Sequence, residues 1–178
     1  LIAAKNDFAH QKLSAQLQDH TLARIYRCIV IGNLREDSGT VDAPIGRHPA
    51  DRKKMAVVAG GRSAVTHWSV LARYRGFTHV ECRLETGRTH QIRAQLAALD
   101  HPVLGDGKYG PAAERSRPLL LHALRLVLPD GRAFACLPPW TGPHALTQMP
   151  DPLPYGPAGA SEGPFPPDKN RAINPPLQ

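Results

Sequence analysis

The stretch Phe77–Arg93 reads FTHVECRLETGRTHQIR, and its periodicity changes midway. Over residues 77–84 apolar and polar side chains alternate, which predicts a β-strand. After the glycine turn that follows, the spacing becomes that of a helix with Thr89 as its N-cap. The predicted buried stripe of this helix consists of Ile92, Leu96 and Leu99. A strand that passes through a glycine turn into a helix is therefore the element around which the fold is built.

The segments on either side complete an α+β pattern. Ala23–Ile31 is rich in β-branched residues and apolar on both faces, which is typical of a strand covered on both sides. Leu119–Leu128 and Ala133–Leu137 predict a closing hairpin. A helix is predicted near the start, from an N-cap at Asp7 to about Asp19. Its residues expected toward a core are Phe8, Leu13 and Leu17. We therefore expect a mixed, largely antiparallel sheet with flanking helices.

The composition indicates one globular domain followed by a different kind of segment. Hydrophobic residues make up 42% and charged residues 21% of the 178 positions, and no apolar run approaches the ~18 residues that a membrane span needs. Nine of the 18 prolines lie in residues 150–178. We expect a domain over residues 1–149 and a disordered Pro-rich tail over residues 150–178.

The charge balance favours a nucleic-acid partner. Lys and Arg number 22 against 15 acidic residues, a net charge of +7, and such a surplus attracts polyanions. The basic residues singled out as RNA contacts are Arg47, Arg52, Lys53, Lys54, Arg62, Arg88 and His90. Each is equally consistent with an ordinary solvated surface cation, since isolated charges at a surface contribute little.

Metal and disulfide chemistry are not indicated. Cys28, Cys82 and Cys136 lie far apart in apolar stretches, and neither CxxC nor HExxH spacing occurs. Reduced, buried thiols of a cytoplasmic protein explain the three cysteines best, and no metal is expected.

Several strings resemble one enzyme family. LETGRTHQIR (residues 84–93), HPVLGD (101–106) and KYG (108–110) closely resemble the RluA/RluD-type RNA pseudouridine synthases, which act on ribosomal or transfer RNA. The resemblance extends in family order over roughly residues 1–140. It is carried further by ARIYRCIVIG, GTVDAPIGRHP, RKKMAV, GGRSAVTHWSVL and LLLHALRLVLPDG.

The resemblance implies an isomerisation of uridine that needs no cofactor. The C1′–N1 bond is broken, the uracil turns, and a C1′–C5 bond replaces it. The family nucleophile is an aspartate in a motif similar to HRLDxxTSGL, which the resemblance places a few residues before Leu1. Residues 1–149 would then be a catalytic domain without its N-terminal part, and we expect the 178-residue chain alone to be inactive.

Two residues inherit catalytic roles from the resemblance. Arg93 resembles the arginine that ion-pairs with the nucleophile, where an opposite charge lowers the pKa of a carboxyl group. Tyr26 resembles the tyrosine that stacks on the flipped uracil and takes the C5 proton, although the strand pattern alone is also that of a half-buried core aromatic. The central expectation is that Arg93 and Tyr26 converge on one basic pocket.

The implied partner is RNA, most of all large-subunit ribosomal RNA, with transfer RNA left open. A cytoplasmic monomer is expected, with no contact to membranes. The alternative from another class is a non-catalytic basic RNA-binding module.

Overall fold

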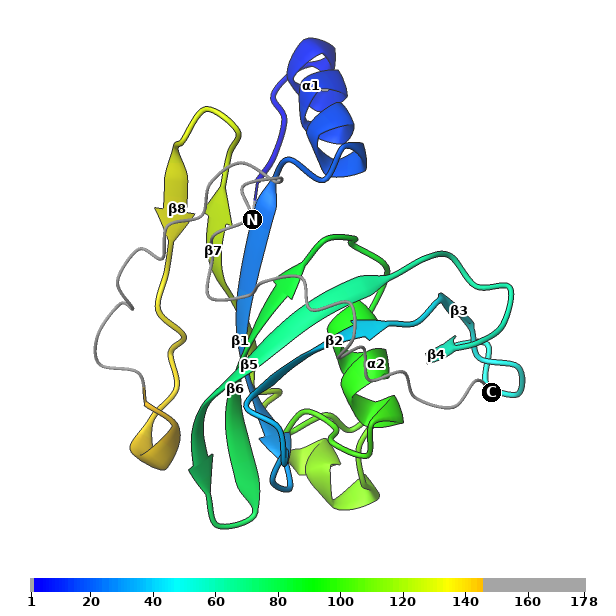
Figure 1. The fold of residues 1–178 in the computed structure, drawn as a ribbon, viewed down its shortest axis with the longest axis vertical. Helices are drawn as coiled ribbons and strands as arrows, with labels where there is room; N and C mark the ends of the chain where they lie inside the picture. The colour runs from blue at the N-terminus through cyan, green and yellow to red at the C-terminus, as the bar shows by residue number, and fades with distance from the viewer. Residues whose placement is uncertain (1, 146–178) are drawn as a thin grey trace.

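Six strands form one sheet in the order β2-β5-β6-β1-β7-β8, and each neighbouring pair is antiparallel (Figure 1). The structure is a computed structural model, and it describes residues 2–145. The strands of this sheet are β1 (Ala23–Ile31), β2 (Ser38–Asp42), β5 (Val65–Tyr74), β6 (Phe77–Leu84), β7 (Leu121–Val127) and β8 (Ala133–Ala135). A separate hairpin pairs β3 (Ile45–Arg47) with β4 (Met55–Val57). The helices are α1 (Asp7–Gln18) and α2 (Gln91–Ala98), with 3-10 turns η1 (Ala112–Ser116) and η2 (Gly142–His144).

This architecture confirms the α+β fold expected from the sequence. β1 and β6 have the predicted bounds, and β7 and β8 form the predicted closing hairpin. The boundary at residue 149 and the Pro-rich segment, residues 150–178, lie outside the described residues. No helix within residues 2–145 is both long and apolar enough to cross a membrane.

Both faces of β1 are covered, as its sequence predicts. Cys28 and Val30 are fully buried in the core that also contains the apolar side chains of α2. Ile25 and Ile29 are 2% and 1% exposed, and strand alternation places them on the opposite face. Tyr26 is partly buried against the same core as Cys28, so its side chain lies on the α2 side of the sheet.

Two of the three cysteines are buried. Cys28 and Cys82 are neighbours across β1 and β6, with their sulfur atoms 3.9 Å apart. The expectation is wrong for Cys136, which is exposed because it directly follows β8, an edge strand whose residues are all exposed. Within residues 2–145, no three His, Cys, Asp or Glu side chains are grouped so that they could hold a metal ion.

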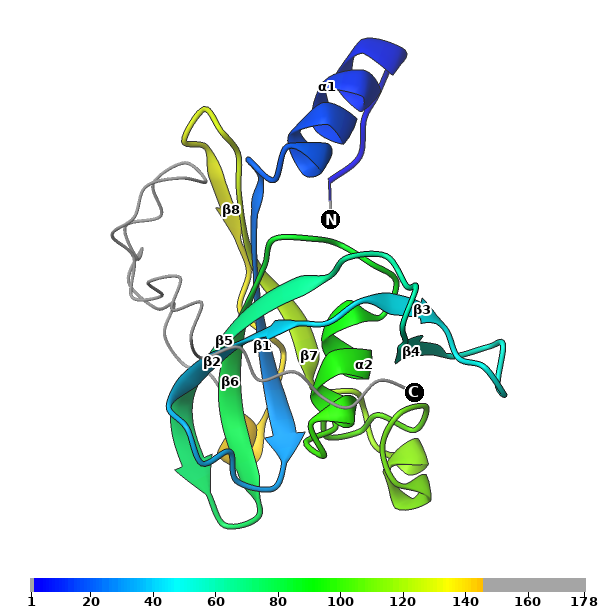
Figure 2. The same ribbon diagram turned by 45° about the vertical axis from the view of Figure 1, so that its right-hand side comes forward.

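Helix α1 forms where expected but does not reach a core. Its N-cap is Asn6, whose side-chain oxygen accepts the Ala9 N–H at 2.9 Å, and not Asp7. No residue of α1 is buried, and Phe8 is 69% exposed. The spacing of its apolar residues predicts an apolar stripe on α1, but no part of the described chain buries this stripe. Among the described residues, α1 projects beyond one end of the sheet (Figure 2).

Helix α2 begins one residue later than a Thr89 cap would give. His90 occupies the N-cap position in the left-handed conformation, with φ of 55° and no capping hydrogen bond from its side chain. The side chain of Gln91, the first helical residue, instead fixes the turn before the helix, because its oxygen accepts the Arg88 N–H at 2.9 Å. A non-glycine residue held at positive φ is uncommon and often marks a functional site.

Gln95 joins α2 to two loops inside the core. Its side chain is fully buried, and its amide nitrogen donates to the carbonyl oxygens of Ala43 and Ala64 at 3.1 and 2.9 Å. Its amide oxygen accepts the Thr66 hydroxyl at 2.6 Å. We expect Gln95→Leu to lower the free energy of unfolding by about 3–5 kcal/mol, because three buried hydrogen bonds are lost.

Urea denaturation measures this loss. Gln11→Leu on the exposed surface of α1 is the matched control, and its effect should stay within about 0.5 kcal/mol. A Gln95→Leu protein as stable as this control would show that the three hydrogen bonds contribute little.

Candidate active site

Arg93 and Asp106 form a two-bond ion pair at the side of α2. The Arg93 Nε and Nη2 atoms donate to the two carboxylate oxygens of Asp106, each at 2.7 Å. The Asp106 side chain is fully buried, whereas that of Arg93 is 17% exposed. One Asp106 oxygen also accepts the backbone N–H groups of Lys108 and Tyr109 at 3.0 Å. Two parallel bonds fix the plane of the guanidinium and leave Nη1 free of this carboxylate.

The pair remains ionised at neutral pH. Burial opposes the charge of Asp106, but the Arg93 bonds and the two backbone donors outweigh it and hold the pKa of this carboxyl below its ordinary value. The hydrogen bond to Asp106 raises the pKa of Arg93. Arg93 is thus a fixed cation whose orientation is set by a carboxylate 13 residues downstream.

Tyr109 lies against this pair and connects it to the basic hairpin. The Arg93 guanidinium carbon is 5.0 Å from the centre of the Tyr109 ring, within the range of a cation–π contact. The phenol oxygen accepts the Met55 N–H at 3.0 Å and lies 2.9 Å from His90 Nδ1. Burial, together with the charges of Arg93 and Lys108, lowers the pKa of His90. The lowered pKa favours the neutral ring, whose tautomer sets the direction of the bond to the phenol.

The β3–β4 hairpin carries four of the predicted RNA contacts. The Arg47 guanidinium donates to the Arg52 carbonyl at 3.2 Å, and the His48 N–H donates to the Lys54 carbonyl at 3.1 Å. Met55 follows directly and binds Tyr109, so the hairpin is docked beside Arg93. The exposed basic side chains of the loop are Arg47, Arg52 and Lys53, and Lys54 is half-buried.

Arg62 lies on a segment that is bonded to the β3–β4 hairpin, and Arg88 contacts the same segment. The backbone of Arg62 exchanges two hydrogen bonds of 2.9 Å with Ile45 of the hairpin. The Arg88 Nε donates to the Ser63 carbonyl, also at 2.9 Å. The structure thus places the loop of β3–β4, Arg62, Arg88 and His90 on adjoining segments, and the contact of these seven residues with RNA stays a prediction.

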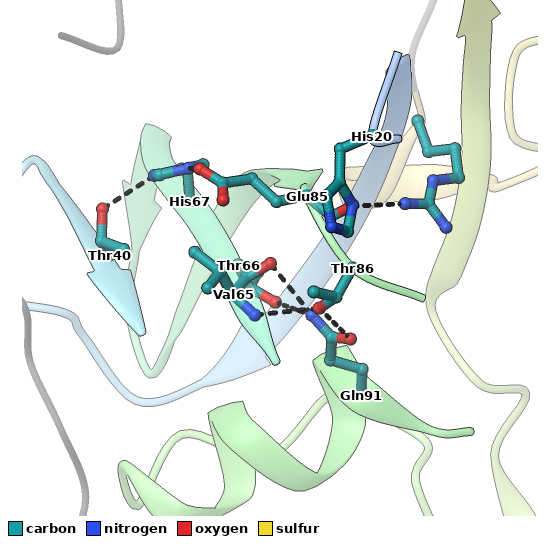
Figure 3. A network of polar contacts seen from close by, with 9 residues as sticks. His20, Thr40, Val65, Thr66, His67, Glu85, Thr86 and Gln91 are labelled. Atoms are coloured by element: carbon teal, nitrogen blue, oxygen red, sulfur yellow. Dashed lines mark hydrogen bonds and ion pairs between the residues drawn. The ribbon is translucent and has the colours of Figure 1, made fainter. Parts of the chain in front are cut away.

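Polar side chains tie the glycine turn after β6 to its neighbours (Figure 3). Gln91 accepts the Thr86 hydroxyl at 2.8 Å and donates to Thr66 and to the Val65 carbonyl at 2.9 and 3.0 Å. In the second network of the figure, Glu85 bonds His67 through its carboxylate, and its carbonyl oxygen bonds His20. The turn that presents Arg88 and His90 is therefore fixed on both sides.

Tyr26 lies on the same side of the sheet as α2, next to Cys82 across the β1–β6 pair. Arg24 lies two residues before Tyr26 on the same face of β1. No hydrogen bond or ring contact joins Tyr26 to Arg93 within residues 2–145. The shared face meets one condition for the expected pocket, and the convergence of the two side chains on one substrate stays a prediction.

Four polar residues of the site were not singled out from the sequence: Gln91, Gln95, Asp106 and Tyr109. The string GD before KYG indicated a turn, and Asp106 does bind the turn's backbone. Its pairing with Arg93 has no local signal, because the two residues meet only when the chain after α2 folds back.

The model of the RNA pseudouridylate synthase family matches residues 1–98, more than half of the chain. The chain belongs to this family. Relatives named as synthases of the family support the assignment. Over 111 residues the chain is 52% identical to RNA pseudouridine synthase YlyB of Bacillus subtilis, whose printed name calls it uncharacterized. Over 110 residues it is 52% identical to ribosomal large subunit pseudouridine synthase D of Pseudomonas aeruginosa.

These alignments cover only part of each family member. They include 62% of this chain and 37% of the Bacillus protein, and 62% of this chain and 34% of the Pseudomonas protein. Among solved structures, human RNA pseudouridylate synthase domain containing 1 superposes with a TM-score of 0.68 at 27% sequence identity, over 78% of this chain and 63% of that one. Human RNA pseudouridylate synthase domain containing 4 superposes with a TM-score of 0.63.

Proposed function

We propose that the protein isomerises specific uridines of large-subunit ribosomal RNA to pseudouridine. The observation that carries the proposal is the fixed guanidinium of Arg93, held by Asp106 on the same side of the sheet as Tyr26 and flanked by the basic β3–β4 hairpin. The choice of ribosomal RNA is supported by the name of the Pseudomonas relative, a ribosomal large subunit pseudouridine synthase. The site of action is the cytoplasm, and the protein acts as a monomer.

In this proposal Arg93 pairs with two carboxylates. Asp106 occupies Nε and Nη2, and Nη1 faces the nucleophilic aspartate that the family resemblance places before Leu1. A cation next to the nucleophilic carboxylate favours its charged form and so keeps it ionised at neutral pH. The buried Asp106 gives the guanidinium one orientation, so that it need not reorient when the substrate enters.

In the proposal, Tyr26 transfers the proton that leaves C5. The C1′–N1 bond breaks and a C1′–C5 bond forms, after which the proton on C5 must leave and N1 must gain one. The Tyr26 oxygen takes the C5 proton while its own hydroxyl proton passes on toward N1, so that the phenol is regenerated, and its ring covers one face of the flipped base. The substrate and product have the same atoms, so neither an oxidant nor a cofactor is needed.

Incubating the full-length protein with unmodified large-subunit rRNA tests the proposal. Digestion to nucleosides followed by chromatography separates pseudouridine from uridine, although their masses are equal. We expect one or a few pseudouridines per RNA molecule. Binding without any pseudouridine would favour a non-catalytic RNA-binding module, and product only on transfer RNA would redirect the target.

The 178-residue chain by itself is expected to form no pseudouridine. Arg93 and Tyr26 are present, but the carboxylate that attacks C1′ would be missing from the reaction. The same nucleoside assay checks this, with the full-length protein as the positive control. Pseudouridine formation by the short chain would place the nucleophile within residues 1–178.

Lys53 and Lys54 are expected to bind RNA phosphates. Changing both to Ala should weaken RNA binding and lower the slope of log K against log salt by about 1–2, because each phosphate contact releases counterions. Arg35 and Arg75, exposed in loops outside the hairpin and the groove beside Tyr26, give a double-Ala control with a smaller effect. Identical affinity and salt slope for the Lys53/Lys54 variant and the wild type would exclude this role.

A further inference from the structure

We propose that Arg24 and Arg88 form a phosphate-binding site beside Tyr26, which holds a backbone phosphate of the RNA next to the target uridine. This inference rests on the proposed function and assigns a new substrate contact to it. Arg24 is the second residue of β1, two positions before Tyr26 on the same face of the strand.

The guanidinium of Arg24 packs against the turn at Glu85 and Gly87. Its Nη2 donates to the Glu85 carbonyl at 2.8 Å. Its Nη1 lies where a side chain at Gly87 would begin, since a Cβ there would be 2.2 Å away. Its Nε is buried and has no hydrogen-bond partner. The glycine thus lets a cation approach the backbone of the same turn that presents Arg88.

No carboxylate balances these two cations among residues 2–145. Glu85, the acidic residue nearest to Arg88 in sequence, directs its carboxylate to His67 instead (Figure 3). Arg88 donates to a carbonyl oxygen and forms no ion pair within the same residues. Burial lowers the pKa of Arg24; Tyr26 partly offsets this, and the charge of Arg88 lowers the pKa further. A partly desolvated guanidinium beside a second one is unfavourable until an anion joins them.

The position of Arg24 beside Tyr26 fits a phosphodiester. Arg24 and Tyr26 both line the open groove between α1 and the β7–β8 hairpin, a cavity of about 940 Å³. Side chains two positions apart on a strand are about 6.6 Å apart along it, a span that one nucleotide can bridge from its base to its backbone. Guanidinium groups bind phosphate oxygens through paired N–H donors.

The test measures whether the contribution of Arg24 to RNA binding depends on one particular phosphate. After the modified uridine has been mapped, RNA fragments are made in which one phosphate near it at a time is a neutral methylphosphonate. We expect one such position to weaken binding to the full-length wild type several-fold and to have no further effect on Arg24→Met. Arg24→Met itself should bind unmodified RNA about 5–10-fold more weakly, with a salt slope reduced by about 1.

Two further variants separate charge from geometry. Gly87→Ala keeps both arginines but displaces the Arg24 guanidinium, and it should reproduce most of the loss of binding. Arg75→Met, in an exposed turn, should bind RNA as the wild type does. If every methylphosphonate affects the wild type and Arg24→Met equally, the phosphate site is wrong.

A structural role for Arg24 gives a different result. If Arg24→Met lowers the melting temperature while leaving the phosphate coupling intact, the guanidinium serves the fold and the proposal is overturned. Failure of the proposed function would look different again, since the wild type would then form no pseudouridine in the rRNA, even where it binds this RNA.

Discussion

Replacing Arg93 with methionine is expected to lower the rate of pseudouridine formation by at least about 100-fold, the loss typical when a preorganised electrostatic contact is removed. The nucleophilic carboxylate would lose the cation that keeps it ionised and oriented. Arg93→Lys should lose nearly as much, because an ammonium cannot bind Asp106 through two parallel donors and still face a second carboxylate. Single-turnover kinetics with saturating enzyme measure the effect on the chemical step.

The same substitution should also destabilise the protein, because it leaves Asp106 buried without a counterion. Removing one partner of a buried pair typically costs about 3–5 kcal/mol. Adding Asp106→Asn to Arg93→Met removes the unpaired charge and keeps an acceptor for the turn's N–H groups. This double variant should regain stability and remain inactive. A stable double variant with wild-type turnover would show that Arg93 has no catalytic role.

Tyr26→Phe is expected to slow the reaction by about 100- to 10,000-fold, the range for loss of a general acid–base group. The ring that covers the uracil is retained, so the affinity for RNA should change by less than about threefold if stacking is preserved. Tyr26→Leu should lose both the rate and part of the affinity. Rates from single turnover and affinities from filter binding separate the two contributions.

A contrary result for Tyr26 has a clear structural meaning. Tyr26 is partly buried against the core below α2. If Tyr26→Phe were fully active and Tyr26→Leu only less stable, the residue would be a packing aromatic, the alternative that the strand pattern left open.

The sequence predicted those parts of the fold that depend on local periodicity. The alternation in residues 23–31 and 77–84 gave β1 and β6 their bounds, because each side chain of a strand meets one face or the other. The change of period after Gly87 located α2. Its N-cap was misassigned because Thr89 has suitable chemistry, whereas the side chain of Gln91 binds the turn instead.

The contacts that hold the site could not be predicted in the same way. Asp106 reaches Arg93, and Met55 reaches Tyr109, only through the tertiary fold. The stripe of α1 looked like a core-facing surface, yet Phe8 is largely exposed among the described residues. The seven basic residues were individually weak signals. They became candidates for one surface only in the structure, where the hairpin and the glycine turn place them near Arg93.

The most direct test of the whole account is a pseudouridine map of large-subunit rRNA from cells that lack the gene. We predict that at least one uridine stays unmodified, that the wild-type gene restores its pseudouridine, and that the Arg93→Met variant does not. A map identical to that of the parent cells, or restoration by Arg93→Met, would contradict the account.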